Sequence, residues 1–412
     1  MSDLYIIMPN KNISKNLQEK IETSLKDLKF ETNDELEAYN IKVNGKYESN
    51  KEIRRDVFDD CNIKSNRKYE RNKDSRIYTY KYVYDIEDVL DFRNKKLLFV
   101  AEIDDIGIDI DMLLFLKKLT SKGKDSLENS TAGIVVFSKS DDFTKRFAQD
   151  IIFCANSLGC CFIGHPLVES IEGFKNFSTW KKTMDLSFED ICVYMLKNLI
   201  QRILEYTYKQ KEETNILVLY SSPHKYSNTR HLWSMVASNI KKNNKNNKDK
   251  KNNKNNINIK ELLIEENKIQ DCKGCPYEMC IHYGKKNTCF YGGVITEDVL
   301  PSIKESDVIV WLCPNYNDSI SANLMATINR LTVLYRKMNF YEKSIIGVIV
   351  SGNSGSDSIA KQLIGSLNVN KGFRLPPYFS IRAIANDPKA IEKIDGIEDR
   401  ARTFCENMMK NI

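Results

Sequence analysis

The chain has 412 residues, which is long for a single hydrophobic core, so we expect two domains. Its hydrophobic content of 42% and charged content of 29% are typical of a soluble globular protein. The N-terminus has no signal-peptide pattern, and the longest nearly uncharged stretch, residues 151–168, is interrupted by polar residues and a proline. These features argue against a membrane-spanning protein, and we expect a cytoplasmic location.

The net charge of +6 is modest, and part of it lies in one segment. Residues 241–256, KKNNKNNKDKKNNKNN, contain no apolar residue and therefore cannot pack into a core. The tract also lacks an aromatic side chain that could stack on bases. We interpret it as a solvated loop insertion and expect no nucleic-acid partner.

The first half begins with a strand, a loop and a helix. A short apolar strand, Leu4–Met8, is followed by a polar loop and by an amphipathic segment that ends near Leu28. Further apolar strands are expected at residues 97–101 and 133–138. Apolar residues at helical spacing in segment 187–213 predict a helix that closes the first domain and links it to the second.

The second half repeats this order. The run Ile216–Tyr220 lacks polar alternation, as expected for a strand that is buried on both faces of a parallel sheet. The motif at residues 295–300, Ile-Thr-Glu-Asp-Val-Leu, matches Asp-Ile-Glu-Asp-Val-Leu at residues 85–90. We infer an internal duplication and an α/β fold of two doubly wound parallel sheets in tandem. Strands of the second sheet are also expected at residues 257–264, 308–312 and 347–351.

Three polar loops follow strands of the second sheet, where doubly wound sheets bind ligands. The first, residues 221–229, offers hydroxyls and backbone N–H groups beside a helix start, so it is either a phosphate loop or an ordinary Ser/Asn-rich N-cap. The second, residues 313–321, has amides and a tyrosine that can contact the edge and face of a planar heterocycle. The third, residues 351–358, has two glycines that allow close backbone approach. Together the three loops describe a flavin mononucleotide (FMN) site.

A cysteine-rich loop lies at residues 271–293. Four cysteines in such a Gly-containing loop suit an iron–sulfur cluster or a zinc ion. A loop of unligated, redox-active thiols is the alternative, and the sequence leaves all three open. The four residues are Cys272, Cys275, Cys280 and Cys289.

Residues 214–412 resemble the NADPH-dependent FMN reductase and iron–sulfur flavoprotein branch of the flavodoxin-like superfamily. The segment SSPHKYSNT at residues 221–229 is similar to the family's phosphate loop, G-S-P-R-x-x-[SG]-N-T, with His224 in place of the arginine. The family's P-x-Y-x-x-S loop, which holds the isoalloxazine ring, is matched by Pro314, Tyr316 and Ser319. The resemblance covers about half of the chain.

The resemblance implies a flavodoxin-like fold, FMN as cofactor, NAD(P)H as co-substrate and a [4Fe–4S] cluster on the four cysteines. The flavin supplies the reactive chemistry, so no protein acid or base is required, and we assign no catalytic residue. The implied cofactor-binding residues are Ser222, His224, Ser227, Asn228, Thr229, Pro314, Asn315, Tyr316, Asn317, Ser319, Ser351, Gly352 and Asn353.

The expected function is an FMN-dependent NAD(P)H oxidoreductase that passes electrons through FMN to a small-molecule or protein acceptor. The alternative is a non-catalytic flavin/iron–sulfur electron carrier or redox sensor that uses the cysteines. We expect an FMN-binding domain at residues 214–412, a linker helix at 186–213 and a degenerate flavodoxin-like copy at 1–185, whose segment Ile103–Ile108 has paired carboxylates that would repel an anionic cofactor. Domains of this kind commonly dimerise, which leaves a homodimer open.

Overall fold

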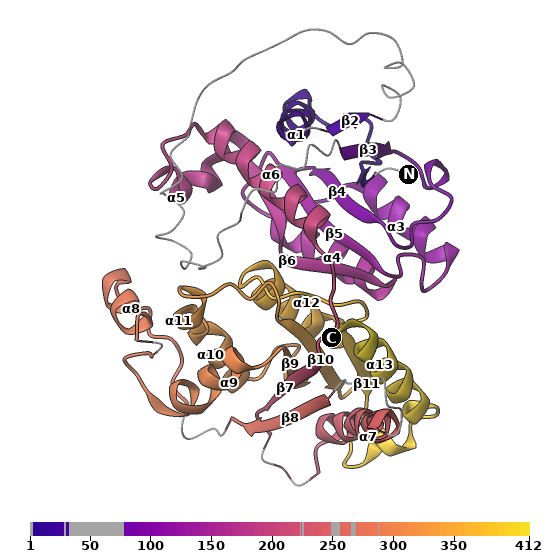
Figure 1. The fold of residues 1–412 in the computed structure, drawn as a ribbon, viewed down its shortest axis with the longest axis vertical. Helices are drawn as coiled ribbons and strands as arrows, with labels where there is room; N and C mark the ends of the chain where they lie inside the picture. The colour runs from indigo at the N-terminus through magenta and orange to yellow at the C-terminus, as the bar shows by residue number, and fades with distance from the viewer. Residues whose placement is uncertain are drawn as a thin grey trace. The chain divides into compact units, whose positions relative to one another are not determined.

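The computed structural model describes residues 3–28, 30–32, 78–222, 224, 226–248, 256–264, 269–286 and 288–412. They form two compact units, one of residues 1–152 and 166–206 and the other of residues 153–165 and 207–412. Figure 1 shows a sheet with flanking helices in each half of the chain. The domain limits expected at residues 185 and 213 stay a prediction.

The N-terminal sheet has the strand order β2-β3-β1-β4-β5-β6, and its last strand, β6, includes residues 160–165 that group with the second unit. The pairs β2–β3, β3–β1, β1–β4 and β4–β5 are parallel. Helix α1 packs against α6, and the Ser24 hydroxyl donates to the Val193 carbonyl at 3.3 Å. The elements are β1 (Leu4–Ile7), α1 (Lys15–Asp27), β2 (Phe30–Thr32), β3 (Tyr78–Val83), η1 (Ile86–Asp88), β4 (Lys96–Ile103), α3 (Ile110–Lys122), β5 (Ser130–Ser138), α4 (Thr144–Ser157), β6 (Cys160–Ile171), η2 (Glu172–Phe177), α5 (Ser178–Lys181) and α6 (Phe188–Glu205).

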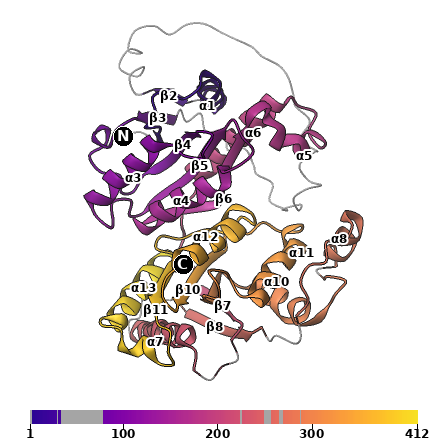
Figure 2. The ribbon, with the colours of Figure 1, turned by 180° about the vertical axis from the view of Figure 1, so that it is seen from behind.

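The second unit is built on a parallel sheet with the order β11-β10-β9-β7-β8. Helices α7 and α13 lie side by side in both views (Figures 1 and 2). The elements are β7 (Glu213–Tyr220), α7 (Asn228–Lys248), β8 (Asn256–Leu263), α8 (Tyr277–Gly284), η4 (Ile295–Val299), α9 (Leu300–Glu305), β9 (Val308–Pro314), α10 (Ala322–Arg330), α11 (Thr332–Tyr335), β10 (Ser344–Ser351), α12 (Ser356–Leu363), η5 (Ile364–Val369), β11 (Ser380–Ile384), η6 (Ala390–Lys393) and α13 (Ile397–Asn411).

The two sheets share one topology. In chain order, the strands β1, β3, β4, β5 and β6 occupy the same sheet positions as β7, β8, β9, β10 and β11, and β2 is an additional edge strand. This is the flavodoxin-like strand order, and it confirms the predicted α/β fold of two doubly wound sheets in tandem. The matching hexapeptides at 85–90 and 295–300 differ locally, because the first forms a 3-10 turn and the second a π-helical turn.

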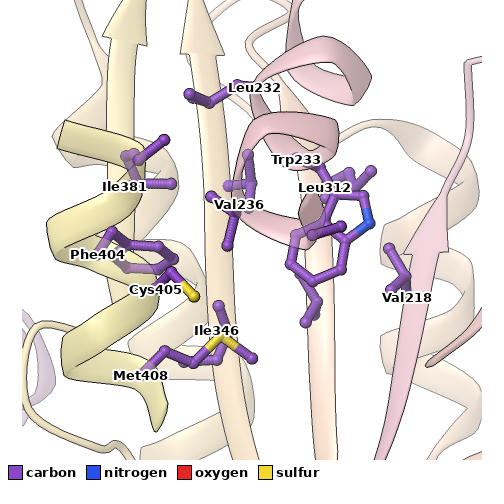
Figure 3. Packing of buried hydrophobic residues seen from close by; sticks show 14 of the residues in the cluster. Val218, Leu232, Trp233, Val236, Leu312, Ile346, Ile381, Phe404, Cys405 and Met408 are labelled. Atoms are coloured by element: carbon purple, nitrogen blue, oxygen red, sulfur yellow. The ribbon is translucent and has the colours of Figure 1, made fainter. Parts of the chain in front are cut away.

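One face of the second sheet is covered by α7 and α13. Figure 3 shows side chains of both helices, such as Trp233 and Phe404, packed against β-strand residues such as Leu312 and Ile346. Each fully buried side chain of this size contributes roughly 1.5–3 kcal/mol, several times more than a surface ion pair such as Lys361–Asp357. Apolar packing therefore holds α7, and with it the loop at its N-terminus, against the sheet.

The Lys/Asn tract differs in part from its prediction. Helix α7 continues to Lys248, so the interpretation as a loop is wrong for residues 241–248. Lysine and asparagine can extend an existing helix because they need only stay solvated. Residues 249–255 lie outside the described residues. Among the helices that the structure describes, none has the length and apolar character needed to cross a membrane.

Candidate functional site

The three loops singled out in the sequence follow β7, β9 and β10, which are neighbours in the sheet. Tyr220 pairs with Leu312, and Pro314 pairs with Val350, so the three parallel strands end at nearly the same level. The loops therefore meet at the carboxyl edge of the sheet. The chain continues from β7 to β8 on one side and from β9 to β10 on the other, so the topological switch point lies between β7 and β9.

The first loop leads into helix α7. The Ser227 hydroxyl accepts a hydrogen bond from the Arg230 backbone N–H at 3.3 Å, so Ser227 caps the helix. One such cap satisfies only one of the N–H groups exposed at a helix start, and the first turn contains no acidic residue. Ser222 and Thr229 are buried, whereas His224 is exposed. The N-cap and the phosphate-loop interpretations of this loop are thus compatible, because the Ser227 cap leaves other backbone N–H groups of the first turn available to bind an anion.

Asn228 has a structural role that its sequence position did not reveal. Its side-chain amide donates to the carbonyls of Ala385 at 3.1 Å and Asp387 at 2.8 Å, and its Oδ1 accepts from the Ile391 N–H at 3.5 Å. Both amide hydrogens are therefore committed to the loop that follows β11. Asn228 ties the start of α7 to that loop, and only its backbone remains for a ligand.

A pocket with a cavity volume of 240 Å³ lies along the outer side of the α7 start. Two cations line it: Arg230 lies 4.6 Å from the Tyr220 ring, and Lys389 lies 5.3 Å from the Tyr226 ring. Acidic Glu261 and Glu392 also line it, and Glu261 accepts from the Trp233 indole at 2.9 Å. The charges of this pocket are mixed and do not point to one ligand.

Asn315 organises the second loop. Its side-chain nitrogen donates to the Asp318 carboxylate at 2.9 Å, the Ser351 hydroxyl at 3.1 Å and the Ser354 carbonyl at 3.0 Å. Its Oδ1 accepts from the Asp318 N–H at 2.7 Å. The side chain therefore joins the second loop to the third.

The tip of the second loop is a tight turn. Asn317 and Asp318 both have positive φ, at 53° and 55°, and the Ser319 N–H donates to the Tyr316 carbonyl at 3.1 Å. Two consecutive positive φ values are typical of a type I′ turn, which suits Asn and Asp. The turn exposes 51% of Tyr316, which leaves its ring available for stacking. Pro314 ends β9 just before the turn.

The third loop approaches the second closely. Gly355 has φ +82°, and a Cβ atom there would lie 1.8 Å from the Asp318 carboxylate. A Cβ atom on Gly352 would lie 2.9 Å from Oδ1 of Asn386. Ser351 is fully buried, and the Asn353 side chain accepts from the Ser354 N–H at 2.8 Å. Glycine at 355 is therefore required by both the backbone conformation and the packing.

Residues outside the predicted set hold the loops together. The Ser221 and Ser321 hydroxyls are hydrogen-bonded at 2.7 Å, which joins the first loop to the start of α10. Gln362 donates to the Asp318 carbonyl at 2.7 Å and accepts from the Ile320 N–H at 3.1 Å. No local sequence pattern marks these residues, because each contact joins segments that are more than 40 positions apart.

The four predicted metal ligands border one pocket with a cavity volume of 50 Å³, together with Tyr283, Phe290 and Tyr291. The Cys275 thiol donates to the Tyr291 hydroxyl at 3.9 Å. Within the described residues, however, no three His, Cys, Asp or Glu side chains are arranged to hold a metal ion. The structure thus brings Cys272, Cys275, Cys280 and Cys289 to one pocket, and the arrangement of the described residues gives no support to a metal centre there.

Arg330 fixes the ends of this cysteine-rich segment. Its guanidinium donates to the Gln270 carbonyl at 3.2 Å, and on the other side to the Gly292 carbonyl and the Thr296 hydroxyl, both at 2.8 Å. The side chain is only 3% exposed, and within the described structure its Nε has no hydrogen-bond partner. Arg330 therefore closes the loop at its base.

In the first unit, a carboxylate of the chain itself binds the helix start that corresponds to the first loop of the second unit. The Ser14 backbone N–H, at the start of α1, donates to the Glu102 carboxylate at 2.6 Å. In the loop after β4, Asp104 accepts from the Ile106 and Ile108 N–H groups at 3.1 and 2.9 Å. Glu102 therefore occupies a backbone N–H at the position that corresponds to the phosphate loop, and Asp104 lies in the loop that corresponds to the second loop. The interpretation of this unit as a degenerate copy stays a prediction.

Residues 214–386 match the model of the NADPH-dependent FMN reductase family. A search of curated proteins gives no match. Among solved structures, RosB with bound 8-demethyl-8-formylriboflavin-5'-phosphate is similar at 14% identity, over 48% of this chain and 77% of that chain, with a TM-score of 0.35. The NAD(P)H:quinone oxidoreductase from Methanothermobacter marburgensis is similar at 12% identity, over 48% and 97% of the two chains, with a TM-score of 0.35. An azoreductase from Bacillus anthracis str. Sterne is similar at 13% identity, over 48% and 97%, with a TM-score of 0.31.

The family match names FMN and covers all three loops at the edge of the second sheet. It confirms the resemblance of the second half to FMN reductases, while the [4Fe–4S] cluster remains a prediction without support from the pocket geometry. Residues 214–386 thus match the NADPH-dependent FMN reductase family, and this match supports an NAD(P)H-dependent flavin oxidoreductase.

Proposed function

We propose that FMN binds across the ends of β7, β9 and β10, and that electrons from NAD(P)H pass through it to a small-molecule or protein acceptor. One observation carries the proposal. Three loops with the residue types of a phosphate site, an aromatic site and a glycine-rich site meet at one sheet edge. This is the edge at which doubly wound sheets bind nucleotides.

The phosphate lies at the start of α7 in this proposal. Its ligands are the hydroxyls of Ser222 and Thr229 and the backbone N–H groups from Ser227 onward. These donors and the helix dipole favour a dianion without a fixed cation, since His224 is exposed to water. Asn228 acts through its backbone, because its side chain holds the loop after β11.

The isoalloxazine ring lies against the second and third loops. Tyr316 offers its face for stacking, and the backbone of Asn317 and Ser319 offers hydrogen bonds to the ring edge. Gly352 and Asn353 form the opposite wall, and Ser351 and Asn315 hold the two loops in register. The side chains of Asn315 and Gln362 fix this geometry before a ligand is present.

Bound FMN would supply the chemistry of hydride acceptance from the nicotinamide and of onward electron transfer. The residues of the chain bind FMN and orient it. The α7 start holds the phosphate, the turn at 316–319 positions the ring, and the buried strand ends exclude water from beneath it. Cys313, at the end of β9, is fully buried, and burial raises the pKa of its thiol, so it does not act as a nucleophile here.

A titration with FMN tests the proposed phosphate site. We expect the S222A and T229A variants (Ser222→Ala, Thr229→Ala) to weaken FMN binding by about ten- to a hundredfold, the effect of losing one hydrogen bond to a charged group. Ser234→Ala is the matched control, because Ser234 is exposed one to two turns further along α7 and donates to the His231 carbonyl. Equal affinity in all three variants, or no FMN uptake by the wild type, would refute the site.

The alternative function, an electron carrier or redox sensor, is favoured by the four thiols that border one pocket. Anaerobic mixing with NADPH and an excess of a quinone or azo dye separates the two functions. Repeated turnover supports the reductase. A single stoichiometric reduction, unaffected by added acceptor, supports the carrier.

A further inference from the structure

The carboxylates of the second and third loops differ in their charge partners. Each loop, at residues 313–321 and 351–358, contains one acidic residue and no lysine or arginine. Asp357 of the third loop is paired with Lys361 at 3.4 Å. Asp318 of the second loop forms no ion pair with any residue that the structure describes. The negative charge of Asp318 is therefore not compensated by a cation within the described part of the chain.

The Asp318 carboxylate is held in a defined position, although the residue is exposed. Its Oδ1 accepts from the Asn315 side-chain amide at 2.9 Å, and its backbone N–H donates to the Asn315 Oδ1 at 2.7 Å. The Gln362 amide donates to its carbonyl at 2.7 Å. The same Oδ1 lies so close to Gly355 that a Cβ atom there would be 1.8 Å away. The charge is therefore fixed between the second and the third loop.

Asp318 lies within the part of the chain that is proposed to hold the isoalloxazine ring. Its sequence neighbours Asn317 and Ser319 offer backbone hydrogen bonds to the ring edge in that site, and the third loop forms the opposite wall. Consecutive Cα atoms are about 3.8 Å apart, which is short compared with the screening length of about 8–10 Å at ordinary salt concentrations. A flavin held in this site therefore experiences the charge of Asp318.

We propose, as an inference that rests on the proposed function, that Asp318 lowers the reduction potential of the bound flavin. The hydride from the nicotinamide brings two electrons and one proton to FMN, and at neutral pH it leaves one additional negative charge on the ring system. The carboxylate of Asp318 repels this charge and thus favours the oxidised over the reduced cofactor. A lower potential makes the reduced flavin a stronger electron donor to the acceptor. Asp318 acts through its charge and takes no part in hydride transfer.

A structural role of Asp318 predicts a different outcome from an electrostatic one. Asp318→Asn separates the two roles, because the amide oxygen can accept the same hydrogen bond from Asn315, and asparagine tolerates the positive φ of 55° at this position. The variant therefore keeps the turn and removes the charge. Asp357→Asn is the matched control, since the carboxylate of Asp357 is already paired with Lys361.

Potentiometric titration of the FMN-loaded full chain against a redox dye measures the effect. We expect Asp318→Asn to increase the ratio of the affinities for reduced and oxidised FMN about five- to tenfold, which is a shift of about 20–30 mV towards positive potential for a two-electron couple. Asp357→Asn should keep the wild-type potential. Equal potentials for the wild type and Asp318→Asn, or an equal shift in both variants, would overturn the inference. FMN uptake during loading tests the proposed function separately, and a wild type that takes up no FMN overturns both.

The dependence on salt distinguishes a charge effect from a change in packing. Raising the salt concentration from about 0.1 M to about 1 M shortens the screening length from about 10 Å to about 3 Å. The difference in potential between the wild type and Asp318→Asn should therefore fall by about half or more. A difference that stays constant over this range would show that Asp318 acts through the structure of the loops, and it would overturn the electrostatic role.

Discussion

Arg330 carries a positive charge in a buried position, and its acceptors are two carbonyls and a hydroxyl. Replacing it with methionine should release both ends of the cysteine-rich segment, since hydrogen bonds from a charged donor contribute about 1.5–3 kcal/mol each. We expect the four thiols to react with a disulfide reagent at least tenfold faster, as followed by mass spectrometry of the labelled peptides. Arg400→Met is the control, because Arg400 is exposed and contacts the Arg382 carbonyl. Unchanged labelling rates would show that Arg330 does not hold the segment.

Lys343 makes the free energy of unfolding of the second unit depend on pH. Burial lowers the pKa of Lys343 to about 8, although its ammonium donates to the Lys304 carbonyl at 2.8 Å. Above that pH the folded protein has lost this proton while the unfolded chain keeps it up to pH 10.5 or so, so stability rises with pH in this window. Between pH 8 and 10 the free energy of unfolding should rise by about 1–3 kcal/mol relative to Lys343→Met. Two of the three tryptophans, Trp233 and Trp311, report on this unit by fluorescence. Parallel pH profiles for wild type and variant would contradict the assignment.

At the scale of residues, the sequence shows which residue types each loop contains better than it shows which role each side chain has. Ser222 and Thr229 are buried and Tyr316 is half exposed, and their roles in binding the cofactor stay predictions. Asn228 and Asn315 are expected to contact the cofactor, which stays a prediction, and in the structure their side chains also bridge loops. An amide can serve either purpose, and its partners are carbonyls of distant loops, whose positions depend on the whole fold.

Between elements, the contact of Gly355 with Asp318 decides how closely the third loop can approach the second. Gly355→Ala should destabilise the second unit by about 1–2 kcal/mol through its positive φ, and it should also displace the Asp318 carboxylate and weaken FMN binding. Gly396→Ala is the matched control: its φ is +67°, it begins α13, and no atom lies within 4 Å of a Cβ there. We expect strain to destabilise both variants, the clash to add to the loss in Gly355→Ala, and a loss of FMN affinity only in Gly355→Ala. Equal FMN affinity would contradict the proposed role of the third loop.

The strands were predictable because parallel, doubly covered strands are uninterrupted apolar runs, as in Ile216–Tyr220. The helix over residues 241–248 was not, because its lysines and asparagines carry no apolar periodicity and follow only from the helix that precedes them. The hexapeptides at 85–90 and 295–300 show the same limit, since nearly identical residues form a 3-10 turn in one unit and a π-helical turn in the other.

On the scale of the whole molecule, the second unit includes a segment from far earlier in the chain, residues 153–165. Within this unit Asn156 donates to the Pro376 carbonyl at 2.8 Å and accepts from the Phe379 N–H at 3.1 Å, and Phe162 pairs with Leu375. A sequence reading that follows strands and helices in order assigns this segment to the first half, because nothing in its pattern marks its later partners.

A protein that comprises residues 207–412 alone should therefore be less stable than the same unit in the full chain. It loses the cover over Leu375 and Phe379, and each apolar side chain left exposed forfeits roughly 1.5–3 kcal/mol. Thermal unfolding followed by tryptophan fluorescence measures the difference. Asn156→Ala in the full chain should cause a smaller part of the same loss of stability. Identical unfolding midpoints for the isolated segment and the full chain would show that residues 153–165 contribute nothing.

The three hydrogen bonds from the Asn315 amide have a kinetic consequence. Since they order the second and third loops in the ligand-free protein, FMN meets a surface that does not have to fold during the encounter. The observed association rate should then increase linearly with FMN concentration, without a plateau, and with a bimolecular rate constant on the order of 10⁵–10⁷ M⁻¹ s⁻¹. Breaking this amide's contacts by Asn315→Ala should introduce a slow, concentration-independent phase in stopped-flow traces, as the loops close only after the flavin has arrived.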